Sequence, residues 1–339
     1  MIDNNKFFIK NLKSVVFLGE NKNLTNFINI NKSLNIETLV ITTSSQKLKI
    51  DKSINYKVFD KINDDFKNFI KKSLSIKNTL FISIAARYIF KKDTIKNFFL
   101  NNLVNIHNAR LPLDSGGGGY SWKILREDRI DNQTIHLIDE KIDHGPIIFN
   151  ISSVVPKGVQ TPLDFDIFSE KNLLKLYEKF IYDLSNEVKF NLKNQIDYIG
   201  RYNPRLNSEI NGSLDWNLEP HDLINFINAF DDPYCGASTY LNNGKFGKLY
   251  LKNCQLHGGD SSNHPFMTGL VTRHDKSWIV VSTKGKYMLL VEKVLNRKNE
   301  NIISKIKVGD RFYTSQKDFF KSFSKRFFYN SKGIKQVKQ

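Results

Sequence analysis

Cysteine is scarce in this chain. Its 339 residues include only two, Cys235 and Cys254. A disulfide framework or a zinc knuckle needs several cysteines at set spacings, which two isolated residues cannot supply. We therefore expect both to be small residues of the interior.

Long apolar runs are missing as well. No stretch approaches the roughly 20 consecutive apolar residues of a membrane helix. The N-terminal segment, residues 1–12, mixes Lys and Asn with a few apolar residues and lacks the apolar core of a secretory signal. These absences predict no membrane partner and a cytoplasmic location.

Several common catalytic motifs are absent too. The first strand-like segment, residues 14–19, continues into Glu20-Asn21-Lys22 rather than into the glycine pattern of a dinucleotide site. The chain has no Walker-type loop, no HExxH zinc motif and no nucleophile elbow. An active site would then be built from strand ends, where open α/β sheets bind their ligands.

Acidic residues are outnumbered by basic ones. The chain has 51 Lys and Arg against 34 Asp and Glu, a net charge of +17. The basic residues are spread along the whole chain rather than gathered in one block, which is typical of a compositional bias of the source genome. A polyanionic partner, either nucleic acid or a phosphorylated small substrate, stays open.

Apolar residues make up 40% of the chain, enough for a full core. The first half alternates short apolar runs with helical patterns, which is typical of an α/β fold. We predict a Rossmann-like, mostly parallel sheet domain over 1–200, ending in a long amphipathic helix over about 167–190. A polar linker over 201–212 leads to a smaller β-rich, barrel-like (OB-like) domain over 213–339. In its basic tail, one helical stripe is expected to join Phe319, Phe320, Phe323 and Phe327.

Two short segments carry candidate chemistry. Asn105 and His107 lie two apart on a predicted strand over 103–107, so their side chains face one side. A strand histidine alone is more often structural. Asp143 follows in a turn between two predicted strands, where it is either a functional carboxylate or a turn residue bonding its own backbone.

These segments together resemble a known family. Asn-Ile-His-Asn-Ala-Arg-Leu-Pro at 105–112 and Asp-His-Gly-Pro at 143–146 look like the formyltransferases that use 10-formyltetrahydrofolate. That family includes glycinamide ribonucleotide transformylase, methionyl-tRNA formyltransferase and the sugar N-formyltransferases. Residues 81–89 also resemble the strand and loop before the motif, so the resemblance covers roughly 14–150.

The resemblance implies a site and a donor. Asn105, His107 and Asp143 take the catalytic positions, and 10-formyltetrahydrofolate supplies the formyl group. Two loops are expected to hold the pterin mainly through backbone groups. They are Ala86, Arg87, Tyr88 and Ile89 in the first loop, and Leu137, Ile138, Asp139, Glu140 and Lys141 in the second. No metal is required.

The segment after His107 departs from the family. Ala109-Arg110-Leu111-Pro112 stands where the family usually reads Ser-Leu-Leu-Pro, and a run of glycines follows. We expect the acceptor near Arg110, Gly117, Gly118, Gly119, Tyr120 and Trp122. The glycines either let backbone amides approach a phosphate or form a tight turn. The two aromatic rings either stack on a base or pack the helix.

The second half resembles the barrel-like domain that follows the catalytic domain in methionyl-tRNA formyltransferase. The similar segments are Gly-Ser-Leu-Asp-Trp at 212–216, residues 224–230, Asp-Pro-Tyr-Cys-Gly-Ala at 232–237 and Val-Gly-Asp at 308–310. Cys235 replaces the usual proline.

The resemblance leaves the acceptor open. A nucleotide-linked amino sugar, with dTDP as the expected nucleotide, would serve surface polysaccharide synthesis, and the glycine-rich segment favours it. Methionyl-tRNA formylation is favoured by the net charge and the second domain. A non-catalytic folate or nucleic-acid binder is the alternative of another class. A homodimer is also considered.

Overall fold

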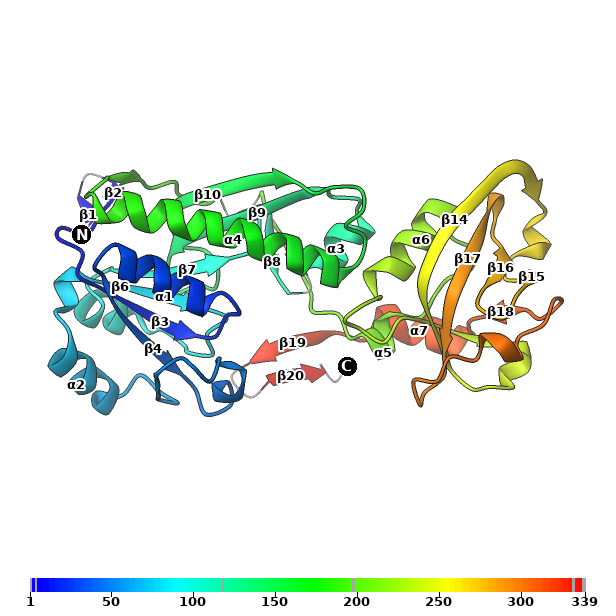
Figure 1. Cartoon of the computed structure of the whole chain (residues 1–339), viewed down its shortest axis with the longest axis horizontal. Coiled ribbons are helices and arrows are strands. Elements are labelled where there is room, and N and C mark those ends of the chain that lie inside the picture. Colours follow the sequence, from blue (N-terminus) through cyan, green and yellow to red (C-terminus); the bar gives the residue numbers. More distant parts are fainter. Residues whose placement is uncertain (1, 4, 118, 197–198, 331–332, 337–339) are drawn as a thin grey trace. The chain divides into compact units, whose positions relative to one another are not determined.

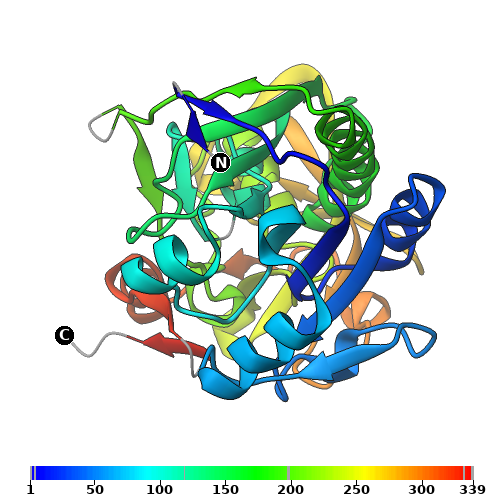
Figure 2. The same cartoon turned by 90° about the vertical axis from the view of Figure 1, so that its left-hand side faces the viewer.

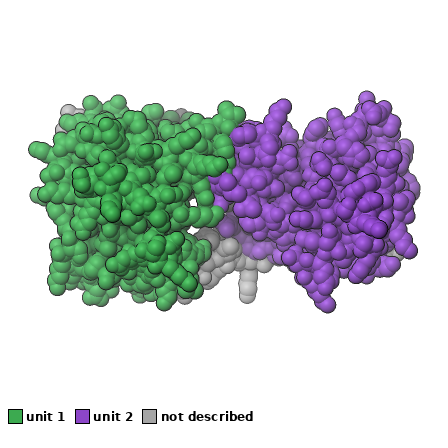
Figure 3. Space-filling view, in the orientation of Figure 1, with its two compact units in different colours: residues 1–116, 130–154, 168–202 green, residues 117–129, 155–167, 203–339 purple. Residues whose placement is uncertain are grey.

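The protein is described from a computed structural model, over residues 2–3, 5–117, 119–196, 199–330 and 333–336. The chain forms two compact units (Figure 3). Unit 1 comprises 1–116, 130–154 and 168–202, and unit 2 comprises 117–129, 155–167 and 203–339. The segments 117–129 and 155–167 thus group with the C-terminal half. The division at 201–212 stays a prediction about domains.

Unit 1 is built on a seven-stranded sheet in the order β10-β9-β7-β6-β3-β4-β5. Its parallel strands are β3 (Ser14–Gly19), β4 (Glu37–Thr42), β5 (Tyr56–Val58), β6 (Thr79–Ile84) and β7 (Leu103–His107). At one edge β9 (Ile130–Leu137) and β10 (Ile147–Val154) run antiparallel. The expected mostly parallel α/β sheet is confirmed.

Both faces of this sheet are covered. Strand side chains alternate, so Val15 and Phe17 enter one apolar cluster while Val16 and Leu18 enter another. The first cluster packs under α1 (Leu24–Ser33) and α4 (Pro162–Ser185), and the second under α2 (Asp64–Ser73) and the turn η3 (Thr94–Phe98). Figures 1 and 2 show α1 beside α4 and α2 away from them.

The long helix α4 differs from its expected bounds. It begins at Pro162 and ends at Ser185, whereas the pattern predicts about 167–190. The start is set by Thr161, whose hydroxyl oxygen accepts the Asp164 N–H while Asp164 Oδ2 accepts the Thr161 N–H. This reciprocal pair is a capping arrangement that an apolar pattern does not reveal.

Short elements complete unit 1. β1 (Ile2–Asp3), β2 (Lys6–Phe7) and β11 (Phe190–Asn191) form a small sheet, and β8 (Asp114–Gly116) pairs with β12 (Arg201–Asn203). The helical turns η1 (Lys47–Lys49) and η2 (Ile76–Asn78) connect larger elements.

Unit 2 centres on a six-stranded antiparallel sheet in the order β15-β16-β17-β14-β13-β18. Its strands are β13 (Ala237–Leu241), β14 (Leu249–Asn263), β15 (Val271–His274), β16 (Ile279–Ser282), β17 (Gly285–Leu295) and β18 (Phe312–Tyr313). Backbone bonds between 309–312 and 269–271, including Phe312 N–H to Gly269 O at 2.8 Å, join its two edges. The predicted barrel-like domain is confirmed.

Helices surround this barrel. They are α3 (Gly119–Leu125), α5 (Ser208–Asn211), α6 (Pro220–Ala229) and the turns η4 (Asn242–Gly244), η5 (Pro265–Met267) and η6 (Ile303–Lys305). Leu223 and Ile227 of α6 enter the apolar core of the barrel together with Trp216 and Phe312, whose rings stack at 5.6 Å. The barrel therefore has its own core.

The phenylalanine-rich tail does not form one packed helical stripe. Helix α7 (Gln316–Ser324) ends before Phe327, which is buried in β19 (Phe327–Asn330), paired with β20 (Gly333–Gln336). Phe320 and Phe323 are exposed. The stripe prediction is wrong because the helix stops at Lys325, an extended residue, and the chain turns into a hairpin.

Candidate active site

Polar side chains gather where β7 ends beside β9. Asn105 and His107 share one face of β7, while Ile106 packs into the core on the other. β9 pairs His136 with Asn105 and Thr134 with His107. Because directly paired residues of antiparallel strands face the same side, four polar side chains meet at this point of the sheet.

His136 holds the Asn105 amide. Asn105 Nδ2 lies 3.1 Å from His136 Nε2, and His136 Nδ1 lies 2.8 Å from the Leu137 carbonyl oxygen. A carbonyl only accepts, so Nδ1 carries the proton and Nε2 accepts from the amide. Burial lowers the pKa of His136 to about 4, and the nearby His107 adds to this shift. The ring is therefore a neutral acceptor at neutral pH.

Asp143 reaches the same place from the loop after β9. Its Oδ2 lies 3.7 Å from His107 Nε2 and its Oδ1 lies 3.9 Å from His136 Nε2. Asp143 has a φ of 55°, in the left-handed region that a short polar side chain tolerates. Gln195 holds the loop by donating hydrogen bonds to the Asp143 and Gly145 carbonyl oxygens, at 2.9 and 2.7 Å.

One ring nitrogen of His107, Nε2, is buried without a hydrogen-bond partner among the described residues. A buried polar atom without a partner costs free energy, so such atoms are often found where a ligand binds. The structure thus brings together all three residues expected to be catalytic, with the imidazole nitrogen facing the carboxylate.

The two loops expected to hold a pterin are joined to each other. Lys92, just after the first loop, forms an ion pair with Glu140 of the second at 2.6 Å. Ala86, Tyr88 and Ile138 pack against the same apolar cluster. The two predicted cofactor segments, 86–89 and 137–141, therefore form one surface.

Apolar side chains stand out on this surface. Ile89 is 78% exposed and Ile142, beside Asp143, is 90% exposed. Arg87 donates to Ser45 Oγ at 3.2 Å, and Tyr88 donates to the Phe59 carbonyl oxygen at 2.7 Å. These contacts hold the first loop in place, and the Ile89 side chain stays exposed.

Of the residues expected near the acceptor, Arg110 lies in unit 1. Its Nη2 is 4.0 Å from Asp114 Oδ2, and Arg201 Nε is 3.3 Å from the other carboxylate oxygen of Asp114. Asp114 is buried. Two guanidinium groups thus share one buried carboxylate, which orders Arg110.

The other expected acceptor residues lie in unit 2. Gly117 donates its N–H to the Asn203 carbonyl oxygen, and Gly118 lies outside the described residues. Gly119 begins α3. Tyr120 packs 5.9 Å from the Phe165 ring, and Trp122 Nε1 donates to the Pro204 carbonyl oxygen at 2.9 Å. These contacts favour packing for both rings, and their role toward an acceptor stays a prediction.

Comparison with known proteins bears on this geometry. Residues 208–307 match the family model described as "Formyl transferase, C-terminal domain". This part of the chain, under a third of its length, is similar to that domain. The expected resemblance to the formyltransferase family is confirmed.

Relatives by sequence match more of the chain. The bifunctional polymyxin resistance protein ArnA of Wigglesworthia glossinidia brevipalpis is 25% identical over 316 residues, covering 87% of this chain and 45% of ArnA. Methionyl-tRNA formyltransferase of Clostridium perfringens is 26% identical over 193 residues, covering 56% of this chain and 58% of that enzyme. The chain thus spans about half the length of these relatives.

Solved structures share the fold. The sugar 3N-formyl transferase WlaRD, solved with dTDP and 5-N-formyl-THF, has a TM-score of 0.57 and 19% identity, over 84% of this chain and 98% of its own. The N-formyltransferase of Helicobacter canadensis, in complex with folinic acid and dTDP-3-aminofucose, has the same TM-score and identity, over 83% and 99%.

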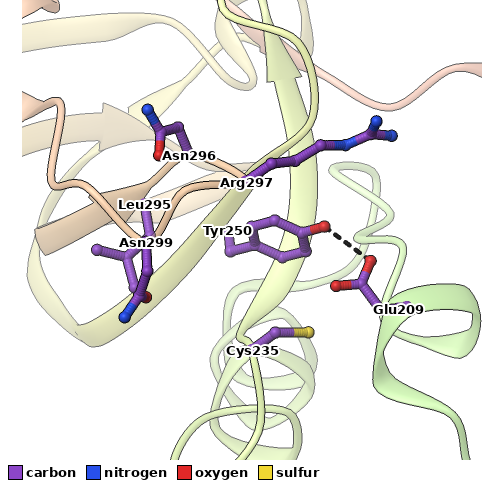
Figure 4. A pocket seen from close by; sticks show the side chains of 7 residues that line it. All are labelled: Glu209, Cys235, Tyr250, Leu295, Asn296, Arg297 and Asn299. Carbon is purple, nitrogen blue, oxygen red and sulfur yellow. Dashed lines mark hydrogen bonds between the residues drawn. The ribbon is translucent and has the colours of Figure 1, made fainter.

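Unit 2 contains a cavity of about 360 Å³. Figure 4 shows its lining: Glu209, Cys235, Tyr250, Leu295, Asn296, Arg297 and Asn299. Tyr250 donates to Glu209 Oε2 at 2.7 Å. Burial and the Glu209 carboxylate raise the pKa of Cys235 to about 11. Its thiol is therefore protonated at neutral pH and a poor nucleophile.

In the described part of the chain, no group of three or more His, Cys, Asp or Glu is arranged to hold a metal ion. The helices described there are too short or too polar to cross a bilayer.

His136 is the site residue that the sequence analysis missed. Thr134 and His136 lie two apart in β9 and so face the same side, but Asp131, Asn132 and Gln133 of the same strand are polar too and hide this pair in the sequence. The pairing of β9 with β7 turns that pair toward Asn105 and His107. That pairing joins segments 31 residues apart and leaves no local pattern.

Proposed function

We propose that this protein is an N-formyltransferase that moves a formyl group from 10-formyltetrahydrofolate to an amine. The convergence of Asn105, His107 and Asp143 at the end of β7 carries the proposal. It is supported by the match of 208–307 to a formyl transferase domain and by neighbouring folds solved with formylated folates.

The site fits such a donor on its own contacts. The unpartnered His107 Nε2 and the two joined loops lie on elements that meet at the β7 end. Residues 86–89 and 137–141 would hold the pterin, with Ile89 and Ile142 offering apolar contact. The bound folate supplies a formyl group on a nitrogen that can leave.

Asn105 and His107 are placed to act on the formyl oxygen. As the acceptor amine forms a bond to the formyl carbon, negative charge develops on that oxygen. One Asn105 N–H is donated to His136, which leaves the second for this oxygen. Protonated His107 adds a charged donor, and donors of this kind commonly contribute a few kcal/mol each.

Asp143 and His136 have different electrostatic roles in the proposed reaction. The Asp143 carboxylate beside His107 stabilises a positive imidazole there and can accept the proton that the amine loses. His136 stays neutral because it is buried and because His107 is close. Two histidines with different environments thus take two roles, acceptor and donor.

For the acceptor, we propose a nucleotide-linked amino sugar, with dTDP as the nucleotide. Two neighbouring folds were solved with dTDP or a dTDP-amino sugar. The net charge of +17 suits a phosphorylated substrate. The role in surface polysaccharide synthesis, the cytoplasmic location and a homodimer stay predictions.

Methionyl-tRNA formylation is the second candidate. The same net charge and the similarity to methionyl-tRNA formyltransferase favour it. A binder without activity is the third.

The test uses the whole chain with 10-formyltetrahydrofolate and either dTDP-amino sugars or charged initiator tRNA. Mass spectrometry detects the gain of one formyl group on the acceptor. Formylation of the sugar supports the proposal, and formylation of tRNA alone supports the second candidate. Binding of the folate without transfer to any amine would support the third candidate, a binder without activity.

A further inference from the structure

The loop that carries Asp143 is closed by a second pair of side chains. His144 Nδ1 lies 2.6 Å from Asp139 Oδ2, across the base of the loop. The other oxygen, Asp139 Oδ1, accepts the Lys141 N–H at 2.9 Å. Both Asp139 oxygens are thus bonded to the loop that follows it, and His144 directly follows Asp143.

This closure acts on a residue with a left-handed backbone. The φ of Asp143 is 55°, a conformation that costs most residues free energy, that Asp tolerates better and that the surrounding contacts support. Gln195 gives that support from one side through the Asp143 and Gly145 carbonyl oxygens. The His144–Asp139 bond gives it from the other. Gln195 thus bonds the Asp143 backbone directly, whereas His144 ties the next residue to Asp139.

Polar contacts hold this loop, among them the Lys92–Glu140 ion pair and the two bonds from Gln195. Ile142 at its tip is 90% exposed, so apolar packing does not anchor it. The Asp143 carboxylate lies 3.7 Å from His107 Nε2 and 3.9 Å from His136 Nε2, so neither contact is a full hydrogen bond. Small shifts of the backbone therefore change both distances.

We propose that His144 is a positioning residue: its bond to Asp139 holds the backbone of Asp143 so that the carboxylate faces His107. This inference rests on the proposed formyl transfer. His144 acts on Asp143 through the loop, by its bond to Asp139.

The pair is partly exposed, with side chains 32% and 36% accessible. Exposed ion pairs contribute little to global stability. Displacement of a catalytic group by about 1 Å, in contrast, can lower a rate by up to about 100-fold. His144 should therefore affect turnover much more than it affects unfolding.

The test compares His144→Ala with His144→Asn. The asparagine Nδ2 takes nearly the place of the ring Nδ1, so it can still donate to Asp139, but it cannot titrate. We expect kcat to fall about tenfold in the alanine variant, with the acceptor KM unchanged, and to recover most of that loss in the asparagine variant. His274→Ala, an exposed histidine of unit 2, is the matched control.

A double-mutant cycle with Asp139→Ala isolates the bond. Once Asp139 is absent, the change at His144 should have almost no further effect on kcat. Additive losses, or an asparagine variant as slow as the alanine variant, would show that the His144 ring acts in another way and overturn the proposal.

Hydrogen exchange gives a readout that needs no activity. Amides of 140–145 should exchange faster in His144→Ala than in wild type and at the wild-type rate in His144→Asn. If wild type transfers no formyl group, the proposed function fails while the exchange still tests the bond. Equal exchange in all three proteins would contradict it.

Discussion

His136 makes the stability of the protein depend on pH in a defined window. Its folded pKa of about 4 lies below the ordinary value of 6.5. Between these values the unfolded chain binds a proton that the folded one does not, so stability is lost as pH falls through this range. At pH 4.5 the loss amounts to about 2–3 kcal/mol, and at pH 7 it is close to zero.

The His136→Gln variant isolates this effect. Glutamine can keep an acceptor near the Nε2 position for Asn105, but it does not titrate. The difference in unfolding free energy between wild type and the variant should therefore fall by about 2–3 kcal/mol from pH 7 to pH 4.5. Urea unfolding followed by far-UV circular dichroism measures it, as a shift of roughly 1 M in the difference between midpoints.

Trp122, Trp216 and Trp278 all lie in unit 2 and supply an internal control. Their fluorescence follows a unit that does not contain His136, so its transition should differ little between the two proteins. A stability difference that is the same at both pH values would refute the inference that His136 is held neutral.

Three further predictions concern single side chains. His107→Ala and Asp143→Ala should each lower turnover at least about 100-fold while keeping folate affinity, which steady-state kinetics and a binding titration measure. Gly145→Ala should destabilise by about 1–3 kcal/mol in a urea melt, because the added Cβ would lie 1.9 Å from the Leu137 carbonyl oxygen. Half-buried Cys235 should react with iodoacetamide at pH 8 about 100-fold more slowly than a free thiol, because its pKa is about 11; an ordinary rate would contradict the raised pKa.

The parallel part of the fold was readable from local patterns. Strands such as β3 and β6 are continuous apolar runs, and the two-residue spacing of Asn105 and His107 placed both on one face. The position of Asp143 near them came from a family resemblance. Its distance from His107 in sequence carries no local signal.

The rest depends on long-range pairing. The antiparallel edge made by β9 decides that His136 reaches Asn105, and only tertiary structure fixes that register. In the tail, the local pattern predicted a helical stripe that is longer than the helix itself. Phe319 to Phe327 fits a helical period, but the helix ends early and Phe327 is buried in a strand. An apolar period predicts a face without saying how far it extends.

The backbone bonds between 309–312 and 269–271, which close the barrel, determine where the chain can be truncated. The family match stops at 307, whereas the segment that seals the barrel is 309–312. A fragment trimmed to the match would leave β13 and β15 with unpaired backbone amides and carbonyls along open margins. Open strand edges pair with other chains, so the truncated fragment should aggregate, whereas a fragment that extends past Tyr313 should not.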